Sequence, residues 1–139
     1  MTRVFISYGD EDREFARWIR GALIQAGIAT NSEDLELSPG ADFSSAIRNA
    51  IQTADALVVI LSDRATSSRH TRLEIGMAAG LGKRVVAIPA PGTKPDIALL
   101  RSIADAYILD AARLEQTEVG TEISKALQGE QMEDKHTGV

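Results

Sequence analysis

The sequence contains no cysteine, which excludes both a disulfide framework and a zinc–thiolate site. Its two histidines, His70 and His136, are too few and too far apart to indicate a metal centre, so we expect no metal and no bound cofactor. No stretch approaches the roughly 18 consecutive apolar residues of a membrane-spanning helix. No basic segment leads into an apolar run after Met1. We therefore expect a cytoplasmic protein without a membrane partner.

Positive charge is also scarce. The chain has 15 Lys and Arg residues against 20 Asp and Glu residues, which gives a formal net charge of -5. This balance argues against nucleic-acid binding through bulk positive charge and favours small molecules or proteins as partners. A chain of 139 residues with 44% hydrophobic residues corresponds to one globular domain with a real core.

Short apolar runs alternate along the chain with segments of helical spacing. Strands are expected at residues 3–7, 28–30, 56–61, 84–89 and 106–109. The first helix follows Asp10 or Asp12, either of which can cap it, and ends at Gly27. The later helices are expected from Phe43 with Asp42 near its start, around Glu74 up to Gly82, over 96–103, and over 119–127.

This alternation predicts an α/β fold of the flavodoxin-like, doubly wound kind. Right-handed crossovers then give a five-stranded parallel sheet of order 2-1-3-4-5 with helices on both faces. Such folds bind ligands beyond the carboxyl ends of the strands, where the first and third strands diverge. The loops expected to meet there are residues 7–12, 62–69 and 31–42.

Glu74 is a carboxylate in an otherwise small and apolar helical segment, "RHTRLEIGMAAGLGKRVVAI". It shares a helix face with Met77 and Ala78, so it lies either at the edge of a core or at the lip of a pocket. The Gly and Ala residues after it predict that the helix lies close to the sheet. A structural alternative is an acid favoured by the helix dipole or paired with Arg69 or Arg72.

Four segments in order resemble a TIR domain (Toll/interleukin-1 receptor homology) of the bacterial type. They are "VFISYGDED", "LELSPGADF", "ALVVILS", and a Glu that follows a Ser-rich loop in "LSDRATSSRHTRLE". The resemblance spans roughly residues 3–128, so we interpret residues 1–128 as a TIR domain and 129–139 as a flexible tail.

The resemblance implies an NAD+ glycohydrolase that is activated by self-association in bacterial signalling or defence. Many bacterial TIR domains cleave NAD+ to nicotinamide and ADP-ribose, or to a cyclic form of it, and their catalytic glutamate matches Glu74. NAD+ is then a substrate, and other TIR domains are the protein partners. The substrate is expected to contact Phe5, Ser7, Tyr8, Gly9, Ser62 and His70. The loop used for assembly corresponds here to a segment containing Asp34, Glu36, Leu37, Pro39 and Gly40.

The chemistry of NAD+ suits a site with one acid. Nicotinamide leaves as a neutral molecule from a cationic pyridinium, so no general acid is required. A single carboxylate can hold the ribose hydroxyls and stabilise the positive charge that develops on the sugar. Hydrolysis of a sugar C–O bond, by contrast, normally takes two carboxylates.

Two other functions stay open. His70 stands where NAD-cleaving TIR domains usually have Trp, which is compatible with a catalytically silent adaptor that acts by protein contact alone. "EIGMAAGLGK" also resembles the Glu-x-Gly-x-Ala-x-x-x-Gly-Lys run of nucleoside deoxyribosyltransferases and related nucleotide N-glycosidases. In such an enzyme His70, one turn from Glu74, could assist a leaving group that requires protonation.

Other nucleotide and phosphate sites are excluded by their motifs. "GLGKR" lacks the pattern of a phosphate-binding loop, and no Gly-x-Gly-x-x-Gly follows the first strand. A phosphoacceptor receiver domain would need an acidic pair at the end of strand one, where this chain has Ser7 and Tyr8.

Overall fold

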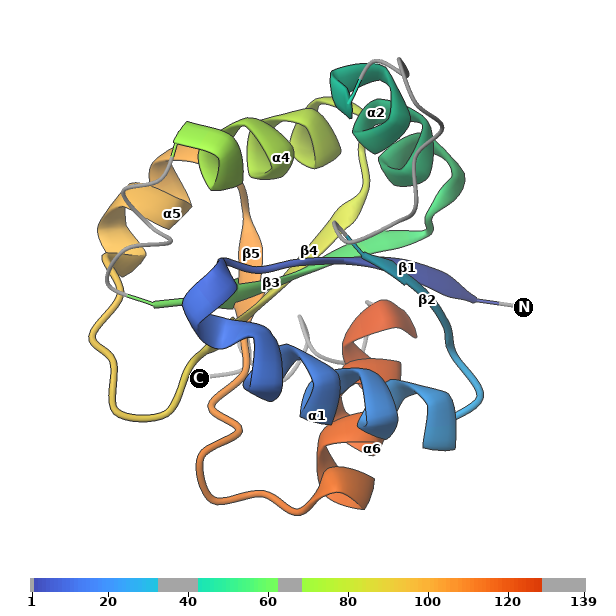
Figure 1. Cartoon of the computed structure of the whole chain (residues 1–139), viewed down its shortest axis with the longest axis vertical. Helices are drawn as coiled ribbons and strands as arrows, with labels where there is room; N and C mark the ends of the chain where they lie inside the picture. The colour runs from blue at the N-terminus through green and yellow to red at the C-terminus, as the bar shows by residue number, and fades with distance from the viewer. Residues whose placement is uncertain (1, 33–42, 63–68, 129–139) are drawn as a thin grey trace, which may run out of the picture.

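The apolar runs of the sequence form a single parallel sheet in the computed structural model, which describes residues 2–32, 43–62 and 69–128 (Figure 1). Within these residues the sheet has five strands in the order β2-β1-β3-β4-β5. The strands are β1 (Arg3–Ser7), β2 (Ala29–Ser32), β3 (Ala56–Leu61), β4 (Arg84–Pro89) and β5 (Ala106–Ile108). The predicted flavodoxin-like fold and strand order are confirmed.

Helices cover both faces of the sheet (Figure 1). They are the short 3-10 helix η1 (Asp10–Asp12), α1 (Arg13–Gln25), α2 (Phe43–Thr53), α4 (Arg69–Gly80), α5 (Ile97–Ile103) and α6 (Gln116–Gln128). Helices α1 and α6 pack on one face, and α2, α4 and α5 pack on the other. The sheet is therefore buried on both sides, which explains why its strands read as continuous apolar runs.

Alternation along β1 divides its side chains between two cores. Val4 and Ile6 belong to the core under α1 and α6, whereas Phe5 belongs to the core under α2 and α4. Because successive side chains in a strand point to opposite faces, Ser7 lies on the same face as Phe5. This puts the last residue of β1 under α4.

Glycine ends two of the helices as the sequence predicts. Gly27 (φ +80°) follows α1 and Gly82 (φ +72°) follows α4, and both adopt the left-handed backbone that favours glycine. The prediction that an aspartate side chain caps α1 is wrong for Asp12. It occupies the N-cap position, but its side chain makes no capping hydrogen bond. Asp42 lies outside the described residues.

The small residues of α4 matter less for its packing than the sequence indicates. Ala78 is fully buried, but a Cβ added at Gly76 would meet only a methyl group of Ile103, at 3.8 Å, and one at Gly80 would meet nothing. Two strands also differ from prediction by one or two residues at their ends. No helix among the described residues is long and apolar enough to cross a membrane.

Candidate active site

The end of β1 and the middle of α4 bring Ser7 and Glu74 into contact. The Ser7 hydroxyl donates a hydrogen bond of 2.5 Å to Glu74 Oε1. Both residues are buried, with Ser7 0% and Glu74 1% exposed. A hydrogen bond to an ionised acceptor is stronger than a neutral one and offsets part of the cost of burying the carboxylate. The structure therefore favours a fixed interior carboxylate over the alternative of a surface acid paired with Arg69 or Arg72, both of which are exposed.

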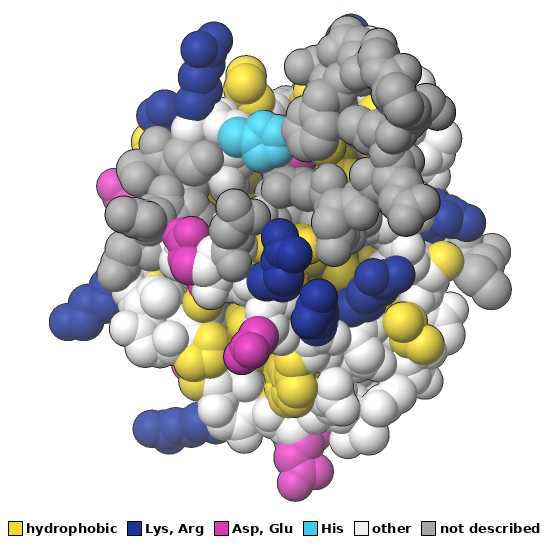
Figure 2. Space-filling view, in the orientation of Figure 1, with side chains coloured by type: hydrophobic (Ala, Val, Ile, Leu, Met, Phe, Trp, Pro, Cys, Tyr) yellow, Lys and Arg dark blue, Asp and Glu magenta, His cyan; other side chains and the backbone are white. Residues whose placement is uncertain are grey.

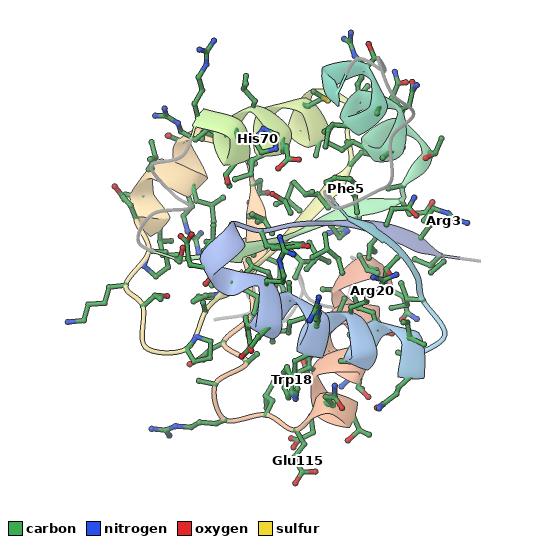
Figure 3. The ribbon with its side chains drawn as sticks, viewed as in Figure 1. Arg3, Phe5, Trp18, Arg20, His70 and Glu115 are labelled. Atoms are coloured by element: carbon green, nitrogen blue, oxygen red, sulfur yellow. The ribbon has the colours of Figure 1, made fainter. Side chains whose placement is uncertain are left out.

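His70 covers the same carboxylate from the solvent side. Its Nε2 lies 3.5 Å from Glu74 Oε2, one helical turn away, and its side chain is 46% exposed against 2% for that of Glu74. Figure 2 shows the imidazole at the molecular surface and Figure 3 shows it above the end of the sheet. The two side chains form an acid–histidine pair with a buried acid and an accessible base.

Phe5 and Tyr8 lie on opposite faces of the sheet. Phe5 is fully buried on the α4 face, two residues before Ser7, and belongs to the apolar core under α2 and α4 (Figure 3). Tyr8 is 9% exposed and packs in the core beneath α1. Of these two residues, only Phe5 lies on the same face as Ser7 and Glu74.

Gly9 and Ser62 belong to a second polar group, on the α1 side. Ser62 is 4% exposed, and its hydroxyl lies 3.5 Å from Glu11 Oε1. A Cβ at Gly9 would come within 3.3 Å of Glu11 Oε2, so this glycine leaves room for the Glu11 carboxylate. Asp12 lies beside the same serine, is 8% exposed, and has one carboxyl oxygen without a hydrogen-bond partner among the described residues.

Burial raises the pKa of Asp12, and the neighbouring Glu11 carboxylate raises it further, although a hydrogen bond from Ser62 opposes both. From the sequence, Asp12 is expected as a helix cap and as the last residue of the loop 7–12 at the ligand edge, but not as a titrating group. The signal that could have identified it is its position at the end of the short segment that follows the central strand β1, in a fold whose ligand site lies there.

The predicted assembly segment lies outside the described residues. This applies to Asp34, Glu36, Leu37, Pro39 and Gly40. Within the described ranges, no group of three or more His, Asp or Glu side chains could hold a metal ion.

On the α4 face, the described residues at the strand ends hold one almost fully buried carboxylate, that of Glu74. A fixed negative charge with little water around it stabilises positive charge developing nearby more strongly than an exposed carboxylate does. Ser7 fixes Oε1, and Oε2 is reached past His70. This geometry suits stabilisation of a cationic sugar centre.

Comparison with protein families gives a match over most of the chain. A family model described as TIR domain matches residues 4–125. No curated protein has a sequence similar enough to match this chain.

Solved structures with the same fold include TIR domains and a nucleotide N-glycosidase. The TIR domain of the Toll-related receptor TRR-2 from Hydra magnipapillata is 19% identical, with a TM-score of 0.70 over 91% of this chain and 98% of that one. The TIR domains of the activated Roq1 resistosome are 19% identical, with a TM-score of 0.67 over 91% and 99%. The CMP N-glycosidase BcmB of Clostridium botulinum is 18% identical, with a TM-score of 0.61 over 88% and 99%. At these identities the similarity shows the fold alone.

Proposed function

The chain belongs to the TIR-domain family, and from this premise we propose that it cleaves NAD+ between nicotinamide and ribose with Glu74 as catalytic residue. The observation that carries the proposal is the buried hydrogen bond of 2.5 Å between Ser7 and Glu74. It holds a carboxylate at the carboxyl ends of β1 and β3, the position where doubly wound folds bind ligands.

The reaction requires stabilisation of a cation more than transfer of a proton. The bond from ribose C1′ to the pyridinium nitrogen breaks, and its electron pair neutralises the ring, so nicotinamide leaves uncharged. The Glu74 carboxylate stabilises the positive charge left on the sugar. Water then bonds to C1′ and releases a proton, giving ADP-ribose, or a group of the ADP-ribose itself bonds there to give a cyclic product.

Substrate reaches Glu74 when the His70 ring turns away from Oε2. The imidazole is half exposed and the carboxylate is buried, so the ring lies between the carboxylate and the solvent. The full site forms when copies associate through the segment that contains Pro39 and Gly40. TIR domains commonly self-associate, which is why activity is expected to depend on protein concentration.

The test is NAD+ consumption by concentrated protein, with Glu74→Gln beside the unchanged chain. Glutamine keeps the shape of the side chain but removes its charge, so the rate should fall at least about a hundredfold, as when one transition-state contact is lost. Glu14→Gln, an exposed position on α1, is the matched control and should keep full activity. Equal rates for Glu74→Gln and the unchanged chain would remove Glu74 from the mechanism.

A nucleotide N-glycosidase is the second candidate, and the contact of 3.5 Å between His70 and Glu74 favours it. A neutral nucleobase is a poorer leaving group than a pyridinium and benefits from protonation. A protonated His70 beside the carboxylate could supply that proton while Glu74 stabilises the sugar cation. The CMP N-glycosidase of the same fold acts on a nucleotide substrate of this kind.

A substrate screen separates the two candidates. Release of base from CMP and from deoxyribonucleotides is measured beside NAD+ loss, for the unchanged chain and for His70→Ala. A general-acid role predicts that His70→Ala lowers nucleobase release at least about a hundredfold and NAD+ cleavage much less. If the assembled protein cleaves neither NAD+ nor nucleotides, the result favours an adaptor that acts by protein contact alone.

A further inference from the structure

Two neighbouring acids, Glu11 and Asp12, take no part in the chemistry proposed for Glu74. Both belong to η1, the short helix that joins the end of β1 to α1. Glu11 is exposed, and its Oε1 lies 3.5 Å from the hydroxyl of Ser62, the residue that follows β3. Asp12 is only 8% exposed and lies beside the same serine. We call Glu11, Asp12 and Ser62 the acidic group.

The acidic group accepts fewer hydrogen bonds than its oxygens allow. Asp12 Oδ2 is buried and has no hydrogen-bond partner among the described residues. Asp12 is also the N-cap residue of α1, yet its side chain does not accept the capping hydrogen bond typical of that position. A carboxylate only accepts, so the missing partner is a donor, and a buried acceptor without a donor costs free energy. A bound molecule with hydroxyl groups supplies such donors.

The acidic group also concentrates negative charge. Burial raises the pKa of Asp12 and the Glu11 charge raises it further, although the Ser62 hydrogen bond opposes both, so the two carboxylates lie close enough to repel each other. Gly9 leaves room for one of them, because a Cβ there would lie 3.3 Å from Glu11 Oε2. A neutral hydroxyl therefore suits this place better than an anionic group does.

The acidic group lies at the same end of the sheet as Glu74. Ser7, the last residue of β1, holds Glu74 on the α4 side, and Glu11 follows four residues later on the α1 side. The two places flank the ends of β1 and β3, where doubly wound folds bind nucleotides. NAD+ has two ribose units, one on each side of its pyrophosphate, so a single dinucleotide has a ribose for each place.

We propose that Glu11, supported by Asp12 and Ser62, binds the adenosine ribose hydroxyls of NAD+ and selects NAD+ over NADP+. The proposal rests on the proposed function. In dinucleotide-binding α/β folds an acidic side chain accepts a hydrogen bond from this ribose 2′-hydroxyl. The 2′-phosphate of NADP+ would bring negative charge and acceptor oxygens to a place that already holds two carboxylates, so the acidic group repels it.

Two substitutions at Glu11 test this selection, and its exposure means that neither should prevent folding. The unchanged chain should prefer NAD+ at least about tenfold in kcat/KM, since like charges in contact cost several kcal/mol. Glu11→Gln should lower that preference by raising KM for NAD+ with little change in kcat, because the ribose is bound equally before and in the transition state. Glu11→Arg should reverse the preference, because arginine accommodates the 2′-phosphate.

The experiment is steady-state cleavage of NAD+ and NADP+ by concentrated protein, for the unchanged chain and both Glu11 variants. Calorimetric titration of the two dinucleotides into Glu74→Gln, with and without Glu11→Arg, measures binding apart from cleavage. Glu14→Gln, an exposed acid in the first turn of α1, is the matched control and should keep the full preference.

A preference for NAD+ that is the same in the unchanged chain and in Glu11→Arg would overturn the proposal. An equal loss of preference in Glu14→Gln would assign the effect to overall charge and would also overturn it, as would a chain that binds neither dinucleotide. The proposed function fails separately. If NAD+ binds more tightly than NADP+ through Glu11, but Glu74→Gln cleaves NAD+ at the unchanged rate, the acidic group keeps its role and Glu74 loses its own.

Discussion

At the level of single residues, the position of Glu74 is set by what surrounds its carboxylate. An ionised side chain buried to 1% exposure is costly unless it accepts hydrogen bonds or faces a charge. Ser7 supplies a hydrogen bond at Oε1, and His70 lies near Oε2. The serine is itself fully buried at the end of a central strand, so it has little freedom to move and fixes one oxygen of the acid.

Ser7→Ala tests this support. Removing the hydroxyl leaves Glu74 Oε1 without that donor, and we expect the free energy of unfolding to fall by about 1–3 kcal/mol. If Glu74 is catalytic, kcat for NAD+ should also fall about tenfold, because the carboxylate is no longer held in one orientation. Urea denaturation and NAD+ turnover measure the two effects.

The control for Ser7→Ala is Ser102→Ala, which removes an exposed hydroxyl from α5 and should change neither quantity by much. A loss of stability in Ser7→Ala with unchanged kcat would contradict the catalytic role of Glu74 but not its structural one.

The residue pattern predicted that His70 lies beside Glu74, but not that Ser7 contacts its carboxylate. Spacing along one helix shows that Glu74 and His70 share a face, because that relation is local. The contact with Ser7 joins residues 67 positions apart and depends on how α4 lies over β1. For the same reason, the sequence could not show that Ser62 and Ser7 lie on opposite faces of the sheet. In the structure, Ser62 contacts Glu11 on the α1 side.

At the level of helices and strands, local patterns predicted the order of elements better than their ends. The runs "ALVVIL" and "RVVAIP" form β3 and β4 with the expected bounds, since each contains an unbroken apolar stretch that is buried on both faces of the sheet. The second strand, expected at 28–30, runs from Ala29 to Ser32 instead. Its residues Thr30 and Asn31 pair with β1, and this pairing depends on the neighbouring strand rather than on hydrophobicity.

The packing of α6 on α1 depends on Gly120, which no sequence pattern distinguished from the other glycines. A Cβ at this position would lie 2.7 Å from the carbonyl oxygen of Ala22 and 3.2 Å from Ala26 Cβ. Replacing glycine by alanine inside a helix normally stabilises it by up to about 1 kcal/mol. Here the close backbone reverses the sign, and we expect Gly120→Ala to lower the free energy of unfolding by about 1–3 kcal/mol.

Thermal or urea unfolding measures the effect of Gly120→Ala. Gly80→Ala is the matched control, because it lies in α4 with nothing within 4 Å of the added Cβ. The control should be neutral or slightly stabilising. Equal effects at both positions would show that α6 can shift away from α1 at little cost.

At the level of the whole molecule, the two faces of the sheet carry different polar groups at the carboxyl ends of the strands. Glu74 with Ser7 and His70 lies on the α4 side, and Asp12 with Glu11 and Ser62 lies on the α1 side. The fold predicted from the sequence indicates this edge as the ligand site. It does not indicate that Glu74 lies on the α4 side and Asp12 on the α1 side, since that depends on the path of the chain after each strand.

Asp12 makes the stability of the molecule depend on pH. Burial, supported by the neighbouring Glu11 carboxylate, raises the pKa of Asp12 in the folded protein above its value in the unfolded chain. Between the two pKa values the folded state binds more protons than the unfolded state. The contribution of Asp12 is therefore fully present below about pH 4 and is lost as the pH rises through the folded pKa.

Asp12→Asn should remove this dependence, because asparagine has a similar shape and does not ionise. We expect the free energy of unfolding of Asp12→Asn, relative to the unchanged chain, to rise as the pH increases from about 4 to 7. Urea denaturation at several pH values measures that difference, and Asp105→Asn at an exposed position is the control, for which it should stay constant. A difference that falls with pH would mean that Asp12 is stabilised as the carboxylate, with the Ser62 hydrogen bond outweighing both burial and the Glu11 charge.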